Sequence, residues 1–251
     1  MSSITVSLIV FACVFGGALV GMLLRTSLPQ HHLIADSKEI VKVGMGLVTT
    51  MAALVLGLLV SSAKSAYDSQ STELTEMSAR IVFLDRVLAH YGSETKEARA
   101  ALRGSVVGSL DKIWPQEQAQ ASGVPPPSIS AETLIDQIQA LSPKDDVRRS
   151  LQAQALNMAI GLGQTRWLIS EQQATSVSKP MLVVLVFWLT AIFISFGLFA
   201  PRNATVITAL CISGLSVSGA IFLILEMYTP FRGLIEISSA PLRFALAHLG
   251  Q

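Results

Sequence analysis

The sequence predicts an all-α, polytopic membrane protein with four transmembrane helices, two before and two after a helical middle segment. Four apolar runs each hold about 20 residues without Asp, Glu, Lys or Arg, enough to cross about 30 Å of hydrocarbon. The chain is 51% hydrophobic and 14% charged, whereas soluble domains are about 25% charged. The runs are Ile4–Leu24, Val43–Ala63, Met181–Ala200 and Ala204–Leu225.

The composition also excludes several classes of function. A net charge of +1 gives no strong attraction to nucleic acid. Cys13 and Cys211 lie inside apolar runs, where cysteine behaves as a small hydrophobe, and no zinc-ligand spacing occurs. The sequence contains no glycine-rich phosphate loop and no catalytic triad order. We therefore expect no enzyme, no cofactor and no metal centre.

The first run is interpreted as a retained helix, because no basic residue precedes it and Arg25 follows it. With four spans, both termini and the middle segment share one side of the membrane. That side carries seven Lys and Arg residues close to the spans, against four on the other side. The positive-inside rule then favours cytoplasmic termini and a cytoplasmic middle segment.

The hydropathy pattern divides the chain into four parts. The second run ends without a helix breaker, and leucine-type residues continue at steps of three and four as far as Tyr91. The expected parts are two spans with their short loop in 1–66, a helical cytoplasmic domain in 67–179, two spans in 180–227, and an interfacial, amphipathic segment in 228–251.

Within the cytoplasmic domain, capping residues and prolines separate the expected helices. Gly92 is a stop signal and Ser93 an N-cap for a helix over Glu94–Trp114. A proline-bearing loop, Pro115–Ser128, follows. The remaining expected elements are a short helix from Ser130 to Leu141, a long helix capped by Ser142 and running toward Pro180, and a C-terminal helix capped by Ser239 with Leu242, Leu246 and Leu249 on one face.

The second run carries small and weakly polar residues on one helix face. Steps of three and four residues place side chains on the same side of a helix. Large apolar residues occupy the opposite side of the run. The residues of this face, which we call the small-residue stripe, are Gly46, Thr50, Ala53, Gly57, Ser61 and Lys64, and Asp68 continues it.

Two interpretations of the stripe stay open at the level of sequence. Small residues let helix backbones approach closely in a membrane. A face of hydroxyl groups and exposed backbone can instead line a water-filled conduit for ions. Lys64 at the cytoplasmic end would attract anions, or it pairs with Asp68 one turn away. Further small-residue pairs, Gly17 with Gly21 and Gly214 with Ser218, predict contacts between helices.

Two segments, Ala53–Asp68 and Glu226–Leu242, resemble the bestrophin-like domain family of bacterial membrane proteins. The second holds the more specific pattern, an acidic residue three positions before Pro-Phe-x-Gly. Its membrane-edge residues are Glu226, Pro230, Phe231 and Gly233. The two-plus-two layout also fits, so the resemblance covers nearly the whole chain.

The resemblance implies a homo-oligomeric ion channel of the bacterial inner membrane, with five subunits favoured and inorganic ions and lipid as partners. The second span of bestrophins lines the pore neck, which implies that Gly46 through Ser61 lie near the axis. Two features differ. Bestrophins narrow the neck with large apolar rings, whereas this stripe is small, and the acidic calcium clasp of bestrophins has no evident counterpart here.

Several residues and functions remain as alternatives. Glu226, at the end of the fourth span, is a candidate functional group, or it is a carboxylate in interfacial water or paired with Arg232. His31 and His32 have poor geometry for a metal site. The alternative to a channel is a non-conducting scaffold or sensor whose cytoplasmic helices bind a partner. A transporter is less favoured because no span has a charged or broken middle.

Overall fold

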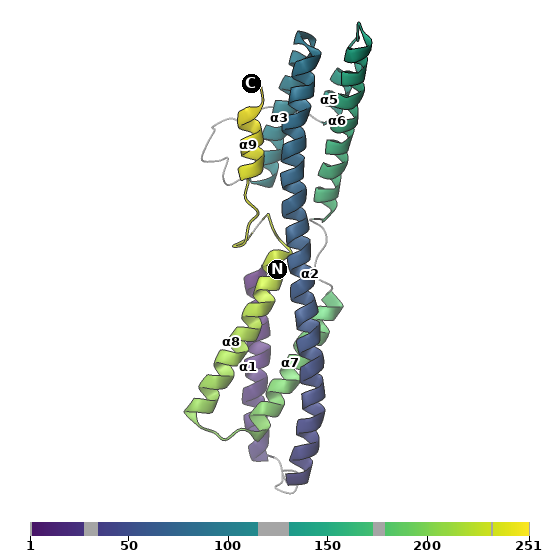
Figure 1. The fold of residues 1–251 in the computed structure, drawn as a ribbon. Coiled ribbons are helices and arrows are strands. Elements are labelled where there is room, and N and C mark those ends of the chain that lie inside the picture. The colour runs from purple at the N-terminus through teal and green to yellow at the C-terminus, as the bar shows by residue number, and fades with distance from the viewer. Residues whose placement is uncertain (1, 28–34, 115–130, 173–178, 232, 251) are drawn as a thin grey trace. The chain divides into compact units, whose positions relative to one another are not determined.

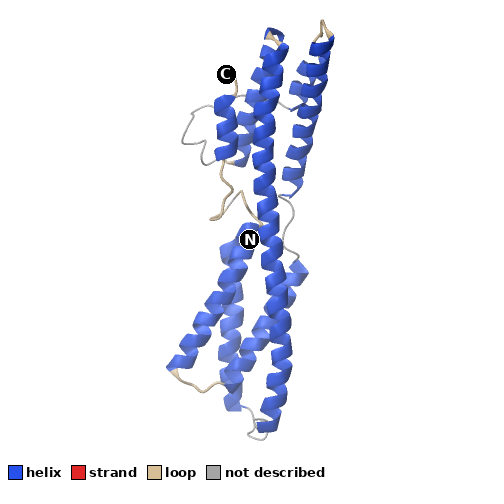
Figure 2. Ribbon diagram, viewed as in Figure 1, coloured by secondary structure: helices blue, strands red, loops and turns tan. Residues whose placement is uncertain are grey.

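The structure is a computed structural model, and it describes residues 2–27, 35–114, 131–172, 179–231 and 233–250. All regular elements in these ranges are helices, as Figure 2 shows. Four of them are long and apolar enough to cross a membrane, which confirms the predicted fold class. The elements (Figure 1) are α1 Ser3–Ser27, α2 Ala35–Tyr91, the 3-10 turn η2 Ser93–Thr95, α3 Lys96–Ile113, α5 Ala131–Gln139, α6 Asp146–Gln172, α7 Lys179–Phe199, α8 Ala204–Met227 and α9 Ala240–His248.

The chain forms two compact units. The first, which we call the membrane unit, comprises Met1–Tyr67 and Thr175–Thr229. Its core consists of apolar side chains from α1, the first part of α2, α7 and α8, such as Val14, Ala63, Leu185 and Ile221. Helix α1 packs against both α7 and α8. Each of these helices keeps large apolar side chains exposed, as expected for a surface that meets lipid.

The backbones of α1 and α7 touch, because each helix places a glycine against the other. A Cβ atom at Gly21 would lie 2.1 Å from the carbonyl oxygen of Ile194, and one at Gly197 would lie 2.0 Å from that of Ala18. Gly17 faces Thr190 of α7, where a Cβ atom would lie 3.1 Å from the side-chain Cγ2 and 3.2 Å from the carbonyl oxygen. The Gly17–Gly21 pair is therefore a helix contact, as predicted. In lipid the hydrophobic effect does not drive helices together, so van der Waals packing between closely spaced backbones stabilises the contact.

The second unit, which we call the helical unit, comprises Asp68–Ala174 and Pro230–Gln251. The predicted apolar face of α2 is confirmed here, since the leucine-type side chains at steps of three and four are all buried. Helix α3 packs against α5 and α9, and α5 packs against α6. The buried residues of α2 are Leu74, Met77, Ile81, Leu84 and Leu88.

Helix α2 ends at the expected residue, but a different side chain completes the turn. Gly92 has φ 133°, a conformation that favours glycine. Ser93 lies inside the 3-10 turn and does not cap α3 through its side chain. The buried Thr95 hydroxyl instead donates to the carbonyls of Leu88 at 2.7 Å and Gly92 at 2.8 Å. The carbonyl of Leu88 is one of those that a helix end leaves without a partner.

The start of α6 also differs from the sequence prediction. Asp145, and not Ser142, caps the helix, because its Oδ1 accepts the backbone N–H of Arg148 at 2.7 Å. Gln152 of α6 then donates from Nε2 to the carbonyls of Ile138 at 2.8 Å and Leu141 at 2.9 Å, which satisfies the end of α5. The predicted continuity between α6 and the third span falls on residues 173–178, outside the described residues. So do the loop Pro115–Ser128 and His31-His32.

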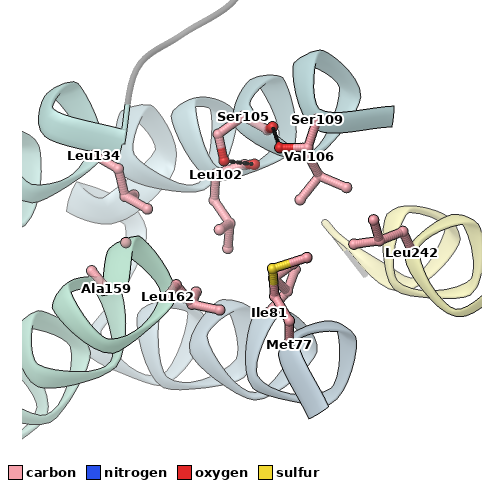
Figure 3. Close-up of a pocket in the computed structure, with 11 residues that line it drawn as sticks. Met77, Ile81, Leu102, Ser105, Val106, Ser109, Leu134, Ala159, Leu162 and Leu242 are labelled. Carbon is pink, nitrogen blue, oxygen red and sulfur yellow. Dashed lines mark hydrogen bonds between the residues drawn. The ribbon is translucent and has the colours of Figure 1, made fainter. Parts of the chain in front are cut away.

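Five helices of the helical unit surround a small apolar cavity of about 40 Å³ (Figure 3). Its lining includes Met77 of α2, Leu102 of α3 and Leu242 of α9. The hydroxyl of Ser105, also on the wall, donates to the carbonyl of Leu102 at 2.9 Å, so this polar group is already satisfied. The cavity is a packing gap between helices, and Gly163 of α6 forms part of its wall.

The Gly163→Ala substitution is expected to stabilise the protein by about 1 kcal/mol, because alanine is the better helix former. A Cβ atom at Gly163 would meet no heavy atom within 4 Å, so the methyl group fits without strain. Thermal unfolding of the purified protein in detergent measures the effect. The comparison is Ala159→Gly on the same wall, which should lower the melting temperature. A lower melting temperature for Gly163→Ala would contradict the prediction.

Candidate functional site

The small-residue stripe lies on the exposed surface of α2. Gly46, Thr50, Ala53, Gly57 and Ser61 are all exposed within the described chain. A Cβ atom at Gly46 or Gly57 would meet no heavy atom within 4 Å. In a single copy the stripe is therefore not packed against the other helices of the membrane unit. Contact with helices of neighbouring copies and the lining of a water-filled conduit are the two interpretations of its small side chains that fit this exposure.

A different side of α2 packs into the membrane unit. Ala52, Leu59 and Ala63 are buried, and they follow one another at steps of seven and four. Only 11% of the apolar window of α2 is buried, against 28% to 33% for α1, α7 and α8. Within the membrane unit, α2 thus contributes one narrow face to the core, and most of the surface of its apolar part is uncovered.

Thr50 carries the hydroxyl group in the middle of the stripe, and this hydroxyl is turned toward its own helix. The hydroxyl of Thr50 donates to the carbonyl of Gly46 at 3.0 Å, a local bond that threonine commonly makes in helices. The hydroxyl oxygen of Thr50 can still accept a hydrogen bond. Gly46 and Gly57 have no side chain, so the backbone is exposed at both positions. Toward the end of the stripe, the Nζ atom of Lys64 lies 5.7 Å from the ring centre of Tyr67.

The small residues of α8 behave differently from the stripe. A Cβ atom at Gly214 would lie 3.6 to 3.7 Å from Phe11 and Phe15 of α1, and Ser218 is buried. This confirms that the Gly214–Ser218 pair lies at a helix contact. The chain therefore contains packed small residues on α1, α7 and α8, and an unpacked set on α2.

The membrane-edge residues begin in the last turn of α8. Glu226 is 5% exposed, and its backbone carbonyl accepts the N–H of Thr229 at 2.9 Å. Two residues further on, the hydroxyl of Tyr228 is hydrogen-bonded to that of Ser62 at 3.1 Å. This bond joins the end of α8 to α2 within the membrane unit. Glu226 is thus a buried carboxylate, and Arg232, its predicted alternative partner, lies outside the described residues.

The remaining residues of that motif belong to the helical unit. The carbonyl of Pro230 accepts the N–H of Ile237 at 2.7 Å, which closes a loop. The edge of Phe231 meets Trp114, with ring centres 5.7 Å apart, and Trp114 Nε1 donates to the carbonyl of Ile237 at 3.0 Å. Gly233 donates its N–H to Glu236 at 3.2 Å. Pro230, Phe231 and Gly233 therefore shape and anchor a loop of the helical unit.

The comparisons with known proteins bear on this arrangement of apolar helices. A model of the Bestrophin-like domain matches residues 12–242, nearly the full length of the sequence. The chain belongs to the Bestrophin-like domain family. Among curated proteins none matches it.

Solved structures agree on the fold of this Bestrophin-like chain. A bacterial bestrophin homologue from Klebsiella pneumoniae with a tryptophan-to-alanine substitution has a TM-score of 0.70 at 14% identity, over 99% of this chain and 97% of that one. The same homologue with a tyrosine-to-alanine substitution has a TM-score of 0.67 at 13% identity, over 96% of both chains. Family and fold together support a channel-like membrane protein.

A buried ion pair in the helical unit was not found from the sequence. Asp85 of α2 is 1% exposed, and Arg99 of α3 donates to both of its carboxylate oxygens, at 2.7 and 2.8 Å. The N–H of Gly250 donates to the same carboxylate at 3.2 Å. Nearby, Arg103 donates to the carbonyls of Leu246 and Leu249, both at 3.4 Å. These bonds hold α9 and the residues after it against α3.

The surroundings of Asp85 set its charge state. Burial by itself raises the pKa of the carboxyl group, but the hydrogen bonds from Arg99 and Gly250 and the charges of Arg99 and Arg86 outweigh burial. The pKa of Asp85 therefore lies below its ordinary value of 3.8, and the bond to Asp85 raises the pKa of Arg99. Because the folded state favours the carboxylate form of Asp85, the ion pair adds stability at pH values above the ordinary pKa of this group. That contribution is lost as the pH falls through the lowered pKa.

The Asp85→Asn substitution is expected to lower the free energy of unfolding by about 3 kcal/mol at pH 7, because it leaves Arg99 largely buried without a counter-charge. The difference from the original protein should shrink as the pH falls below 3.8. Unfolding of the full chain, followed at several pH values, measures both effects. Glu76→Gln is the control, since Glu76 and Arg80 form a pair 3.4 Å apart that is half-exposed and worth less than about 1 kcal/mol. Equal losses for the two variants would contradict the prediction.

The described residues contain no group of three or more His, Cys, Asp or Glu side chains that could hold a metal ion. Glu226 and Asp85 lie in different units, and Asp85 is already committed to Arg99. The small-residue stripe of α2 is the other candidate feature, and its residues from Gly46 to Ser61 are exposed.

Proposed function

We propose that this Bestrophin-like protein is a homo-oligomeric ion channel of the bacterial inner membrane, with the pore lined by α2. The observation that carries the proposal is the exposure of Gly46, Thr50, Ala53, Gly57 and Ser61 on a span that is only 11% buried. In a single copy, this weakly polar face would meet lipid, where exposed backbone and hydroxyl groups gain no hydrogen bonds. A ring of copies places the face around water instead.

The same exposure supports assembly from identical subunits. Large apolar residues flank the stripe on α2, among them Leu47, Leu54 and Leu58, which are 60% to 67% exposed. Contact with neighbouring copies would cover part of this surface, and lipid would cover the rest. We favour five subunits, because that number is implied by the resemblance to bestrophins.

The proposed pore offers ions a narrow, weakly polar path. Side chains between Gly46 and Ser61 carry no charge, and this part of the stripe holds only glycine, alanine and hydroxyl-bearing residues. Such a lining lets backbone and hydroxyl oxygens replace part of the hydration shell of an ion. Lys64 follows at the end of the stripe, on the side that the positive-inside rule assigns to the cytoplasm together with both termini.

Purified protein in planar lipid bilayers tests this proposal. The expected result is discrete conductance steps in symmetrical potassium chloride, together with a ring of subunits in native mass spectrometry. The alternative is a non-conducting scaffold or sensor whose helical unit binds a partner. A single copy in nanodiscs, or a ring that conducts no ion across a range of voltages and pH values, would overturn the channel and favour the scaffold.

A further inference from the structure

Two arginines meet at one end of the α1–α7 pair. Arg25 lies in the last turn of α1 and donates from Nη1 to the carbonyl of Ala200, just after α7. Arg202, in the turn between α7 and α8, donates from Nη2 to the carbonyl of Met22 in α1 at 2.6 Å. Arg25 thus satisfies a carbonyl just after the end of α7, and Arg202 contacts a carbonyl in the last two turns of α1. The C-terminal end of a helix favours a cation.

Neither arginine has a carboxylate partner in the described part of the chain. Arginines of the helical unit differ in this respect, since Arg80, Arg99 and Arg148 each pair with a carboxylate. Among the described residues, the partners of these two positive charges are backbone carbonyls and, for Arg202, the hydroxyl of Thr26 at 3.4 Å. The N-terminus of α8 begins two residues after Arg202 and adds its positive dipole end.

The lengths of the two helices predict that both arginines lie close to the depth of lipid phosphates. Helices α1 and α7 contain 25 and 21 residues, and at about 1.5 Å per residue such helices end near the boundary between hydrocarbon and headgroups. A guanidinium group is planar and binds phosphate oxygens through two parallel hydrogen bonds. Contact between the α1 and α7 backbones at Gly21 and Gly197 holds together the two helix ends to which Arg25 and Arg202 are hydrogen-bonded.

We propose that Arg25 and Arg202 together bind the phosphate group of an anionic phospholipid. The carbonyl contacts orient each guanidinium group, and the lipid phosphate supplies the negative charge that the described side chains do not. Lipid bound there joins the ends of α1, α7 and α8 and stabilises the membrane unit. This site does not depend on whether α2 conducts ions.

Thermal unfolding of the full-length protein in detergent, titrated with phosphatidylglycerol, tests the site. The melting temperature should rise with the lipid, and the double variant Arg25→Gln/Arg202→Gln should need at least about tenfold more lipid for the same rise. Lys42→Gln removes an exposed cation from the first turns of α2, and this control should respond like the original protein. Phosphatidylcholine and inorganic phosphate should produce no comparable rise.

A second measurement covers the case in which the double variant does not fold. Arg25→Lys/Arg202→Lys keeps both charges and removes the planar fork, and native mass spectrometry counts the phosphatidylglycerol molecules that each protein retains. Fewer retained molecules for the lysine variant than for Lys42→Gln would support the site. Equal retention would overturn it, and so would a full rise of the melting temperature with inorganic phosphate, which would indicate a site for free anions.

Discussion

The Gly57→Trp substitution is expected to reduce the bilayer conductance of the protein to the level of an empty membrane. Gly57 lies in the middle of the stripe, and a Cβ atom there would meet nothing within 4 Å in one copy. A single subunit would therefore accommodate an indole at this position without a clash. The indole would point into the space that we assign to the pore. In a ring, every subunit would contribute one indole at the same level, and the apolar ring would exclude water and ions.

Leu58→Trp is the matched control for this experiment. Leu58 is the next residue of α2 and is 65% exposed, but it projects about 100° away around the helix. Its replacement should leave conductance close to that of the original protein. Native mass spectrometry should find the same number of subunits in both variants. Normal conductance for an assembled Gly57→Trp protein would show that the stripe does not line the pore.

The Gly21→Ala substitution is expected to destabilise the membrane unit by about 3 kcal/mol. The added methyl group would lie 2.1 Å from the carbonyl oxygen of Ile194, and a backbone atom cannot move aside as a flexible side chain can. Helices α1 and α7 would have to separate, and the contacts at Gly17 and Gly197 would weaken with them. Thermal unfolding in detergent, together with size-exclusion chromatography, measures the loss.

Gly16→Ala gives the comparison within the same helix. A Cβ atom at Gly16 would meet no heavy atom within 4 Å, so the substitution should be neutral or stabilise the helix by up to about 1 kcal/mol. Gly21→Ala and Gly16→Ala add the same methyl group to α1, but on different faces of the helix. Similar melting temperatures for both would refute the close contact between α1 and α7.

Local signals in the sequence were sufficient for most of the helices. The length and apolar character of the four runs predicted the spans, because hydrocarbon requires helices of that length. Gly92 predicted the end of α2, because its backbone conformation favours glycine. The start of α6 was misplaced, since Ser142 and Asp145 are both good capping residues and only the path of the chain into the helix selects between them.

The contacts between distant segments were not visible in the sequence. Trp114 was expected only as the end of a helix, yet it holds Phe231 and the carbonyl of Ile237, more than 100 residues away. Asp85 and Arg99 lie on two helices that a turn brings together, and each alone resembles an ordinary surface charge. No local pattern distinguishes such residues, because their partners depend on how the helices pack.

The sequence by itself determined the number of spans, the helical middle segment and the face of α2 that carries small residues, because these depend on length and periodicity. Only the tertiary structure decided which small residues are packed and which are exposed. Gly21, Gly214 and Gly57 are all glycines within apolar runs of the sequence. In the structure, Gly21 and Gly214 face a neighbouring helix, whereas Gly57 does not. The residue type glycine does not indicate whether a neighbouring helix lies against it. That depends on how the helices pack in the tertiary structure.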